Sequence, residues 1–450
     1  MSSVPWQPLL AVAGLVAGVL LLTAGRYGYH RDELYFLEAG RHLAWGYVDQ
    51  PPFTPLLARA LSAIAPESLA VLRLPSALAA GLVVLLTGLM ARELRASRSA
   101  QLLAAACMAV SALLLAVGHL LSTSTFDLLV WTALSWLVVR VLRGGDQRVW
   151  VAVGVLAGVG LLNKSLVLFL VAGLAVGVLV AGPREVLRNR WLWVGAAVAL
   201  ALWAPNLAWQ ASHGWPQLEL SRSIAAGSSG TSAPRALFVP FQLVLISPVL
   251  VPVWVAGLLR LLRDPALRRV RAFGWAYLVL LAVFLVTAGK PYYLGGLYPV
   301  LLAAGAEPTL RWVRRAAGRS RRILLGSALG LSAVVAALLM LPVVPAAALH
   351  ATPIVDINYD AGETVGWPRF TDAVAQVYEE LPATERGGVV LLTANYGEAG
   401  ALDRYGPARG LPRAYSGHNS YAAWGPPPQT SGPVIAVGLP RERLAQLFGS

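Results

Sequence analysis

The first candidates for chemistry in this sequence are the carboxylates that stand beside long apolar stretches. Asp32 and Glu33 follow the first apolar stretch, and Asp127 lies at the start of a later one, in the segment STSTFDLLVW. A carboxylate at membrane depth costs free energy, so each is a functional candidate by default. One at a helix start could take the proton from a hydroxyl nucleophile. Adjacent helical residues point about 100° apart, so only one of the two is expected to face a cavity. We expect Asp32 to be this base, with Glu33 as the second candidate.

These positions also have a structural interpretation. Acidic residues favour the first turn of a helix because of the helix dipole, which would account for Asp32 and Glu33. Asp127 could be the N-cap of the helix that follows it, since Ser and Asp often precede an apolar helix. The sequence leaves both alternatives open, and Asp127 stays a candidate for a second carboxylate of the site.

The two lysines of the chain are the candidates for binding phosphate. The sequence contains 34 Arg but only Lys164 and Lys290, in the segments LLNKSLVLF and GKPYYLGGLYP. Two compact ammonium groups that face one cavity would suit a phosphate or pyrophosphate. The alternative is that both reach lipid headgroups from the ends of their helices. We favour phosphate binding. The aromatic residues mostly fit belts at the membrane interface, although Tyr292, Tyr293 and Tyr298 near Lys290 could line a sugar site.

Metal and nucleotide sites are weakly indicated. The six His have no ligand spacing, so we expect no metal site and no certain cofactor, and a role for a divalent metal is left open. No Walker motif, dinucleotide fingerprint or Ser-His-Asp arrangement occurs. In the C-terminal part, ANYGEAGALDRYG could bind an anion at a helix start, and GHNSYAAWGPP is rich in side chains that contact sugars; both could equally be structural.

Composition places these residues in a membrane protein. Of the 450 residues 57% are hydrophobic and only 13% are charged, whereas a soluble chain carries about a quarter charged residues. A cytosolic globular enzyme is therefore excluded. The net charge of +14 does not indicate nucleic-acid binding, because no polar domain is large enough to carry it. The single Cys107 excludes internal disulfides and thiolate metal clusters.

Eleven apolar segments approach the roughly 20 residues that a spanning helix needs. The segments 149–162 and 165–182 could instead form one helix broken at Asn163-Lys164-Ser165, and we keep them separate because of the charge pattern described next. The expected spans are residues 8–25, 69–91, 100–121, 127–142, 149–162, 165–182, 191–208, 237–259, 272–288, 293–306 and 323–342.

The charge pattern predicts the orientation. With eleven spans, the five loops on the side of the N-terminus contain 20 basic and five acidic residues, and the opposite loops are almost balanced. Since Lys and Arg concentrate in cytoplasmic loops, we expect a cell-membrane protein with a cytoplasmic N-terminus. Arg26 and Arg31 alone favour the reverse orientation, and the later loops outweigh them.

Two long segments are expected on the outer side. Residues 26–68 contain RDELYFLEAGRHLAWG, which predicts an amphipathic helix lying at the outer membrane interface, and a second short helix at 54–65. Residues 343–450 are polar and predict a small α/β extracytoplasmic domain, with strands at 389–392 and 434–437. We therefore expect a transmembrane domain at 1–342 and an outer domain at 343–450, whose completeness at the C-terminus is left open.

The order of these motifs resembles the GT-C glycosyltransferases over roughly residues 20–306. The similarity is greatest to the family 39-like group of protein O-mannosyltransferases and bacterial lipid A aminoarabinose transferases. The motifs that carry it are Arg31-Asp32-Glu33, the outer helix, Gln50-Pro51-Pro52, Thr54-Pro55, Asp127, Asn163-Lys164-Ser165, Lys290-Pro-Tyr-Tyr and Tyr298-Pro299.

This resemblance implies a mannosyltransferase-like activity. A sugar would move from a polyprenyl-phosphate donor to a hydroxyl of a lipid, glycan or protein at the outer face, usually with inversion. Asp32 would be the base, Asp127 a second acid, and Lys164 and Lys290 would neutralise the phosphate leaving group. The resemblance also implies that Arg31 and Gln50 contact the substrate.

One position departs from the group, because aminoarabinose transferases have a Lys before the Pro-Pro pair that contacts the donor phosphate. This chain has Gln50 there, so lipid A is not implied as its substrate.

A transporter or flippase of a lipid-linked saccharide is the alternative function, since it would also use outer cations and a polar cavity. Such transporters usually have repeated halves with helices broken at the midplane, and the sequence has neither feature. We therefore expect a membrane glycosyltransferase in the lipid bilayer, with no nucleic-acid partner.

Overall fold

The computed structural model describes residues 2–227, 234–315, 318–429 and 432–448. The chain divides into two compact units: a first unit of Met1–Ala24 and Arg73–Val343, and a second unit of Gly25–Leu72 and Val344–Ser450. This division differs from the predicted boundary at residue 342, because the first long loop folds with the C-terminal segment rather than with the membrane helices.

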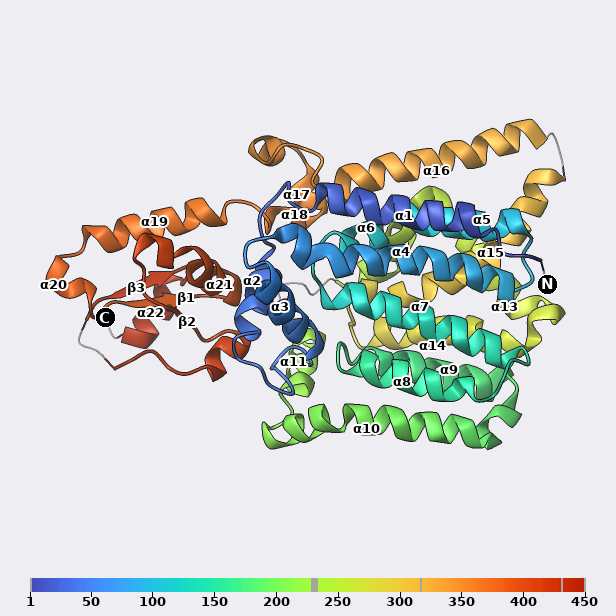
Figure 1. Cartoon of the computed structure of the whole chain (residues 1–450), viewed down its shortest axis with the longest axis horizontal. Helices are drawn as coiled ribbons and strands as arrows, with labels where there is room; N and C mark the ends of the chain where they lie inside the picture. Colours follow the sequence, from blue (N-terminus) through green and yellow to red (C-terminus); the bar gives the residue numbers. More distant parts are fainter. Residues whose placement is uncertain (1, 228–233, 316–317, 430–431, 449–450) are drawn as a thin grey trace. The chain divides into compact units, whose positions relative to one another are not determined.

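The first unit consists of apolar helices that follow the predicted segments (Figure 1). Helices α8 and α9 are separated by a break at residues 162–166, next to Asn163-Lys164-Ser165, while two separate spans remain a prediction. Its helices are α1 (Trp6–Thr23), α4 (Leu69–Glu93), α5 (Arg98–Ala109), α6 (Ala112–Gly118), α7 (Thr123–Leu142), α8 (Val149–Leu161), α9 (Val167–Ala181), α10 (Arg190–Ser212), α11 (Pro216–Ala225), α12 (Arg235–Ile246), α13 (Val251–Arg263), α14 (Ala272–Val286), α15 (Tyr298–Arg314) and α16 (Gly318–Met340).

Many of these helices are suited to a membrane. Among the described residues, α1, α4, α7, α10 and most of α16 are long and apolar enough to cross one, and the bent pairs α5–α6 (58°) and α12–α13 (82°) would raise the number from five to seven. Helices α8, α9 and α14 are apolar but shorter, at 13 to 15 residues. The chain is thus a multi-pass membrane protein, while eleven spans and the orientation remain predictions.

Close helix packing in the first unit depends on small residues. Gly257 of α13 faces the Leu301 carbonyl of α15, and Gly305 of α15 faces the Val253 carbonyl of α13, so a Cβ at either glycine would collide with the backbone of the other helix. Small residues allow such contacts between membrane helices, where apolar side chains gain little by leaving lipid.

The second unit is an α/β domain with a parallel sheet in the order β2-β1-β3. The strands predicted at 389–392 and 434–437 are confirmed as β1 and β3, whereas β2 was not predicted because its three residues are too few to form a pattern. The elements are α2 (Arg31–Ala39), α3 (Phe53–Ile64), α17 (Ile354–Ile357), α18 (Tyr359–Gly362), α19 (Trp367–Glu380), α20 (Ala383–Arg386), β1 (Val390–Thr393), α21 (Tyr396–Tyr405), β2 (Ala414–Ser416), β3 (Val434–Val437) and α22 (Arg441–Phe448).

Helix α2 differs from the expected surface helix. It ends at Ala39, and Leu34, Tyr35 and Phe36 are all buried. It packs on α21 (Figure 1), where a Cβ at Gly400 would lie 2.9 Å from the Leu34 Cβ. The apolar residues of α2 are therefore covered by protein, and the glycines of ANYGEAG serve helix packing.

Candidate active site

The predicted site residues fall into two groups, one in each unit. The second unit contains Arg31, Asp32, Glu33 and Gln50, and the first contains Asp127, Lys164, Lys290, Tyr292, Tyr293 and Tyr298.

The start of α2 distinguishes the two acidic candidates. His30 is the N-cap, and its Nδ1 accepts a hydrogen bond from the Asp32 amide at 3.2 Å. The Glu33 carboxylate is fully buried and accepts from the His30 amide at 2.8 Å, which completes a capping box. Glu33 thus has the structural role that its first-turn position allows. Asp32 has a side chain that is 42% exposed, so it is the carboxylate of the pair that substrate can reach.

Asp32 is held by a residue from the far end of the sequence. The Tyr396 hydroxyl, in the first turn of α21, donates a 2.7 Å hydrogen bond to Asp32 Oδ1. The same hydroxyl accepts from Arg31 Nε at 3.1 Å and Nη2 at 3.0 Å. Burial and the Asp32 charge raise the pKa of Tyr396, so the phenol keeps its proton for Asp32. One carboxylate oxygen is therefore fixed in direction.

Arg31 makes several further contacts around Tyr396. Besides Tyr396 it donates from Nη1 to the Tyr359 hydroxyl at 3.0 Å and lies 3.7 Å from Glu363 Oε2. Its guanidinium also stacks over the Tyr396 ring, 4.7 Å from the centroid. These contacts occupy most of its donors, while its role in substrate binding stays a prediction.

An aromatic cluster surrounds Tyr396. The Tyr35 ring lies 4.9 Å from Tyr396 and stacks on Trp424 at 5.8 Å, so the segment GHNSYAAWGPP packs against α2. The Tyr35 hydroxyl donates to Asp49 Oδ1 at 2.7 Å and accepts from the Ser420 amide at 3.3 Å. Burial raises the pKa of Asp49 to about 7. This cluster couples the first loop to the C-terminal segment.

Gln50 is buried without the partners that its amide needs. Its side chain is 3% exposed, and among the described residues neither Nε2 nor Oε1 has a hydrogen-bond partner. Its backbone carbonyl accepts from the Tyr47 amide at 2.9 Å, which fixes the turn before Pro51. A buried polar group without partners is costly, so its position is consistent with the predicted contact to a ligand.

In the first unit, Lys164 lies in the break between α8 and α9. Its Nζ donates to Ser124 Oγ at 2.8 Å, and it stands 5.4 Å from the Tyr292 ring centroid and 6.0 Å from that of Tyr293. Both tyrosines are partly exposed. The structure therefore brings together Lys164 and two of the three tyrosines predicted to line a sugar site.

Asp127 is not an N-cap, so that alternative is wrong. Helix α7 begins at Thr123, and its N-cap is Ser122, whose side chain accepts from the Ser124 amide. Asp127 lies one turn inside the helix and is 9% exposed. Its carboxylate interacts electrostatically with the Lys164 ammonium. Its Oδ1 has no hydrogen-bond partner among the described residues. The predicted role of Asp127 as a second carboxylate of the site therefore stays open.

The other predicted residues of this unit differ in their surroundings. Lys290 is partly exposed and is the N-cap of the 3₁₀ helix η4 (Pro291–Leu297), two residues before Tyr292. Tyr298 is fully buried, and its hydroxyl donates to Gln242 Oε1 at 3.0 Å. The prediction that Tyr298 lines a sugar site is therefore wrong, because its hydroxyl is used to pack α15 against α12.

Tyr396 is the residue of the Asp32 group that sequence reasoning missed. The segment ANYGEAG was noted for its glycines as an anion site, but the Asn395 side chain accepts from the Gly397 and Glu398 amides and caps the helix. The side chain of this segment that contacts Asp32 is Tyr396, the residue before the first glycine. Within the described ranges, no group of three or more His, Cys, Asp or Glu is arranged to hold a metal ion.

Part of the chain matches a known family. Residues 49–209 match the family described as dolichyl-phosphate-mannose-protein mannosyltransferase. The matched segment includes Gln50, Asp127 and Lys164. A comparison with curated protein sequences gives no significant match.

Solved structures with a similar fold include three glycosyltransferases. ArnT from Cupriavidus metallidurans bound to undecaprenyl phosphate has a TM-score of 0.57 at 16% identity, over 90% of this chain and 88% of that one. An Archaeoglobus fulgidus oligosaccharyltransferase tethered to an acceptor peptide has a TM-score of 0.54 at 13% identity, over 90% and 63%. The arabinofuranosyltransferase AftD from Mycobacteria has a TM-score of 0.51 at 18% identity, over 87% and 31%.

The likeness to the solved structures extends over most of the chain and covers both units. It confirms the resemblance predicted from the motifs at the level of the fold. Together, the family match and the shared architecture support a membrane glycosyltransferase with the GT-C fold.

Proposed function

We propose that this protein transfers a sugar from a polyprenyl-phosphate donor to a hydroxyl acceptor at the outer face of the membrane, with Asp32 as the general base. The observation that carries the proposal is the Tyr396–Asp32 hydrogen bond, which directs one carboxylate oxygen while the side chain stays 42% exposed. Support for the donor class comes from ArnT, which is bound to undecaprenyl phosphate.

In the proposed reaction the acceptor oxygen forms a bond to the anomeric carbon while Asp32 takes the hydroxyl proton. The bond between that carbon and the phosphate oxygen breaks, and the polyprenyl phosphate leaves with the bonding electrons. Attack opposite the leaving group inverts the anomeric configuration. Lys164 and Lys290 offset the charge that grows on the phosphate, and Asp127 serves as a second acid that keeps Lys164 in place.

The test is sugar transfer in proteoliposomes supplied with a polyprenyl-phosphate sugar and a hydroxyl acceptor. Asp32→Asn should lower kcat by at least about a hundredfold and leave the melting temperature within about 2 °C of wild type. Asp372→Asn, which changes an exposed carboxylate of the same unit, should keep full activity. Wild-type turnover by Asp32→Asn would remove Asp32 from the mechanism.

A further inference from the structure

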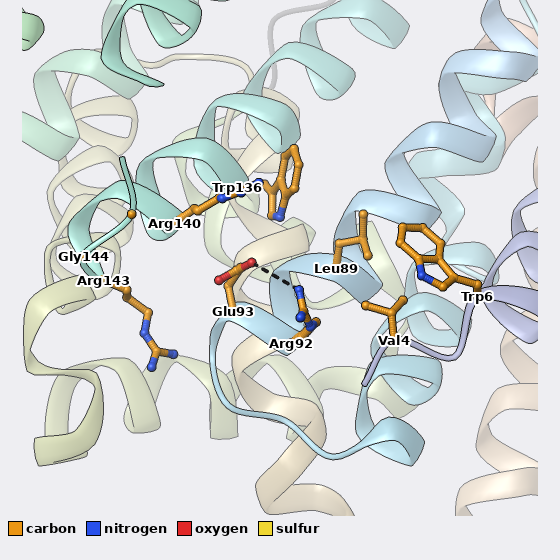
Figure 2. Close-up of a pocket in the computed structure, with 10 residues that line it drawn as sticks. Val4, Trp6, Leu89, Arg92, Glu93, Trp136, Arg140, Arg143 and Gly144 are labelled. Carbon is orange, nitrogen blue, oxygen red and sulfur yellow. Dashed lines mark ion pairs between the residues drawn. The ribbon is translucent and has the colours of Figure 1, made fainter. Parts of the chain in front are cut away.

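A polar cavity lies in the first unit, at the ends of three helices that are able to span a membrane. It has a volume of about 520 Å³ and is lined by residues from the start of α1, the end of α4 and the end of α7 (Figure 2). Its basic residues belong to the segments 92–98 and 140–148, which the charge pattern predicts to be cytoplasmic loops. The cavity therefore lies at the ends of these helices and is expected on the cytoplasmic side.

The cavity carries an excess of positive charge. Arg92, Arg140 and Arg143 line it, and the acidic lining residue is Glu93. Glu93 lies 3.9 Å from the Arg92 guanidinium, which is at the limit of an ion pair. Among the described residues, Arg143 Nη1 is buried and has no hydrogen-bond partner.

The surroundings of Arg143 favour a bound anion. Burial and the neighbouring charge of Arg95 lower the pKa of Arg143, yet a guanidinium stays protonated in proteins. The indole Nε1 of Trp136, on the same wall of the cavity, is also buried without a hydrogen-bond acceptor among the described residues. Two donors from different side chains thus lack the oxygen atoms that an anion would supply.

The opposite wall is apolar. Figure 2 shows Val4, Trp6 and Leu89 on one side of the cavity, and Arg140 and Arg143 on the other. Trp6 is 53% exposed, as is usual for an indole at the membrane–water boundary. A ligand that fills this cavity would combine an anionic head with an apolar body.

We propose that this cavity is a binding site for an anionic phospholipid, with Arg92, Arg140 and Arg143 contacting the headgroup phosphate and Trp6 and Leu89 contacting its apolar part. Basic pockets between membrane helices on the cytoplasmic side bind such headgroups. The site is separate from the proposed transfer reaction, because none of its residues belongs to the Asp32 or Lys164 groups. Free inorganic phosphate has the same headgroup chemistry, and the experiment below distinguishes it.

The experiment measures lipid selectivity of the purified full chain by native mass spectrometry, from mixed micelles of phosphatidylglycerol and phosphatidylcholine. Wild type should retain phosphatidylglycerol with roughly tenfold selectivity, and the double variant Arg140→Gln/Arg143→Gln should lose most of it. The control Arg184→Gln/Arg188→Gln, which removes the same charge from another Arg-rich loop, should keep it.

Glu93→Gln provides an independent variant that leaves the arginines in place. Removing this carboxylate should strengthen phosphatidylglycerol retention about two- to fivefold. Equal retention of the lipid by wild type, the double variant and Glu93→Gln would overturn the proposal. A rise in melting temperature with inorganic phosphate in neutral nanodiscs, together with no lipid selectivity, would also overturn it in favour of free phosphate.

Discussion

The Tyr396 hydroxyl donates a 2.7 Å hydrogen bond to Asp32 Oδ1, and the two residues are 364 positions apart in the chain. This bond joins the first loop to the C-terminal domain at the proposed base. In the proposed reaction, the oxygen that Tyr396 contacts stays fixed and the other carboxylate oxygen takes the proton of the acceptor hydroxyl. The orientation of the base therefore depends on α21.

Removing this hydroxyl tests the positioning role. Tyr396→Phe keeps the ring that packs on Tyr35 but removes the donor, so we expect the fold to persist and kcat to fall roughly ten- to a hundredfold, since small misplacements of catalytic groups are costly. The KM for the donor should stay within about twofold. Tyr359→Phe, which removes another Arg31 contact, is the matched control and should change kcat little. Equal losses in both variants would indicate a general structural effect.

The phosphate role of Lys164 has its own test. Lys164→Ala should lower kcat/KM by about 10²–10³, because an ammonium on a leaving phosphate acts most strongly in the transition state. Ser124→Ala removes only the 2.8 Å hydrogen bond to Nζ and should cost less than about tenfold. Steady-state transfer rates against donor concentration measure both. Unchanged kcat/KM in Lys164→Ala would assign this lysine to lipid headgroups instead.

The buried amide of Gln50 offers a gain-of-binding test. Gln50→Lys places an ammonium where the related aminoarabinose transferases have one, and we expect affinity for polyprenyl phosphate to rise about tenfold, as a charge-assisted contact allows. The ligand-dependent increase in melting temperature measures this change. Gln50→Met, of similar length and without charge, should show no increase over wild type. The same ligand response in all three proteins would place Gln50 away from the donor.

The pKa of Asp49 predicts a pH dependence of the second unit. Its value is about 7 in the folded protein, against about 4 in an unfolded chain, so the folded state binds more protons between these values. Stability from this group is therefore greatest at low pH and decreases as the pH rises from about 4 to 7.

Asp49→Asn should flatten this dependence, because an amide can still accept from Tyr35 but does not titrate. We expect the variant to be about 1–3 kcal/mol more stable than wild type at pH 8 and close to it at pH 4. Fluorescence of Trp424, which stacks on Tyr35, follows unfolding of this region. A wild-type curve that is flat between pH 5 and pH 8 would contradict the prediction.

Local patterns predicted much of this molecule. Apolar stretches located the helices, Asn163-Lys164-Ser165 located the break that presents Lys164, and short apolar runs located β1 and β3. These features depend on neighbours in the sequence. Each motif alone is too short to indicate a function. Their order along the chain is what resembles the GT-C glycosyltransferases.

The errors have a common physical origin in contacts between distant segments. The pattern of α2 showed an apolar face but not whether lipid or α21 covers it. Tyr298 belongs to the same motif as Lys290, GKPYYLGGLYP, but its buried hydroxyl donates a hydrogen bond to Gln242. Tyr396 carried no local signal of its role, because its partners Arg31 and Asp32 lie at the other end of the chain.

The pairing of α2 with α21 also has a consequence for the order of synthesis. Arg31 and Tyr396 are 365 positions apart. Since chains are made at about 5–20 residues per second, α21 is synthesised roughly 20 to 70 s after α2. During that time Leu34, Tyr35 and Phe36 have no α21 to cover them. The packing of α2 is therefore completed only after the C-terminal segment has been made.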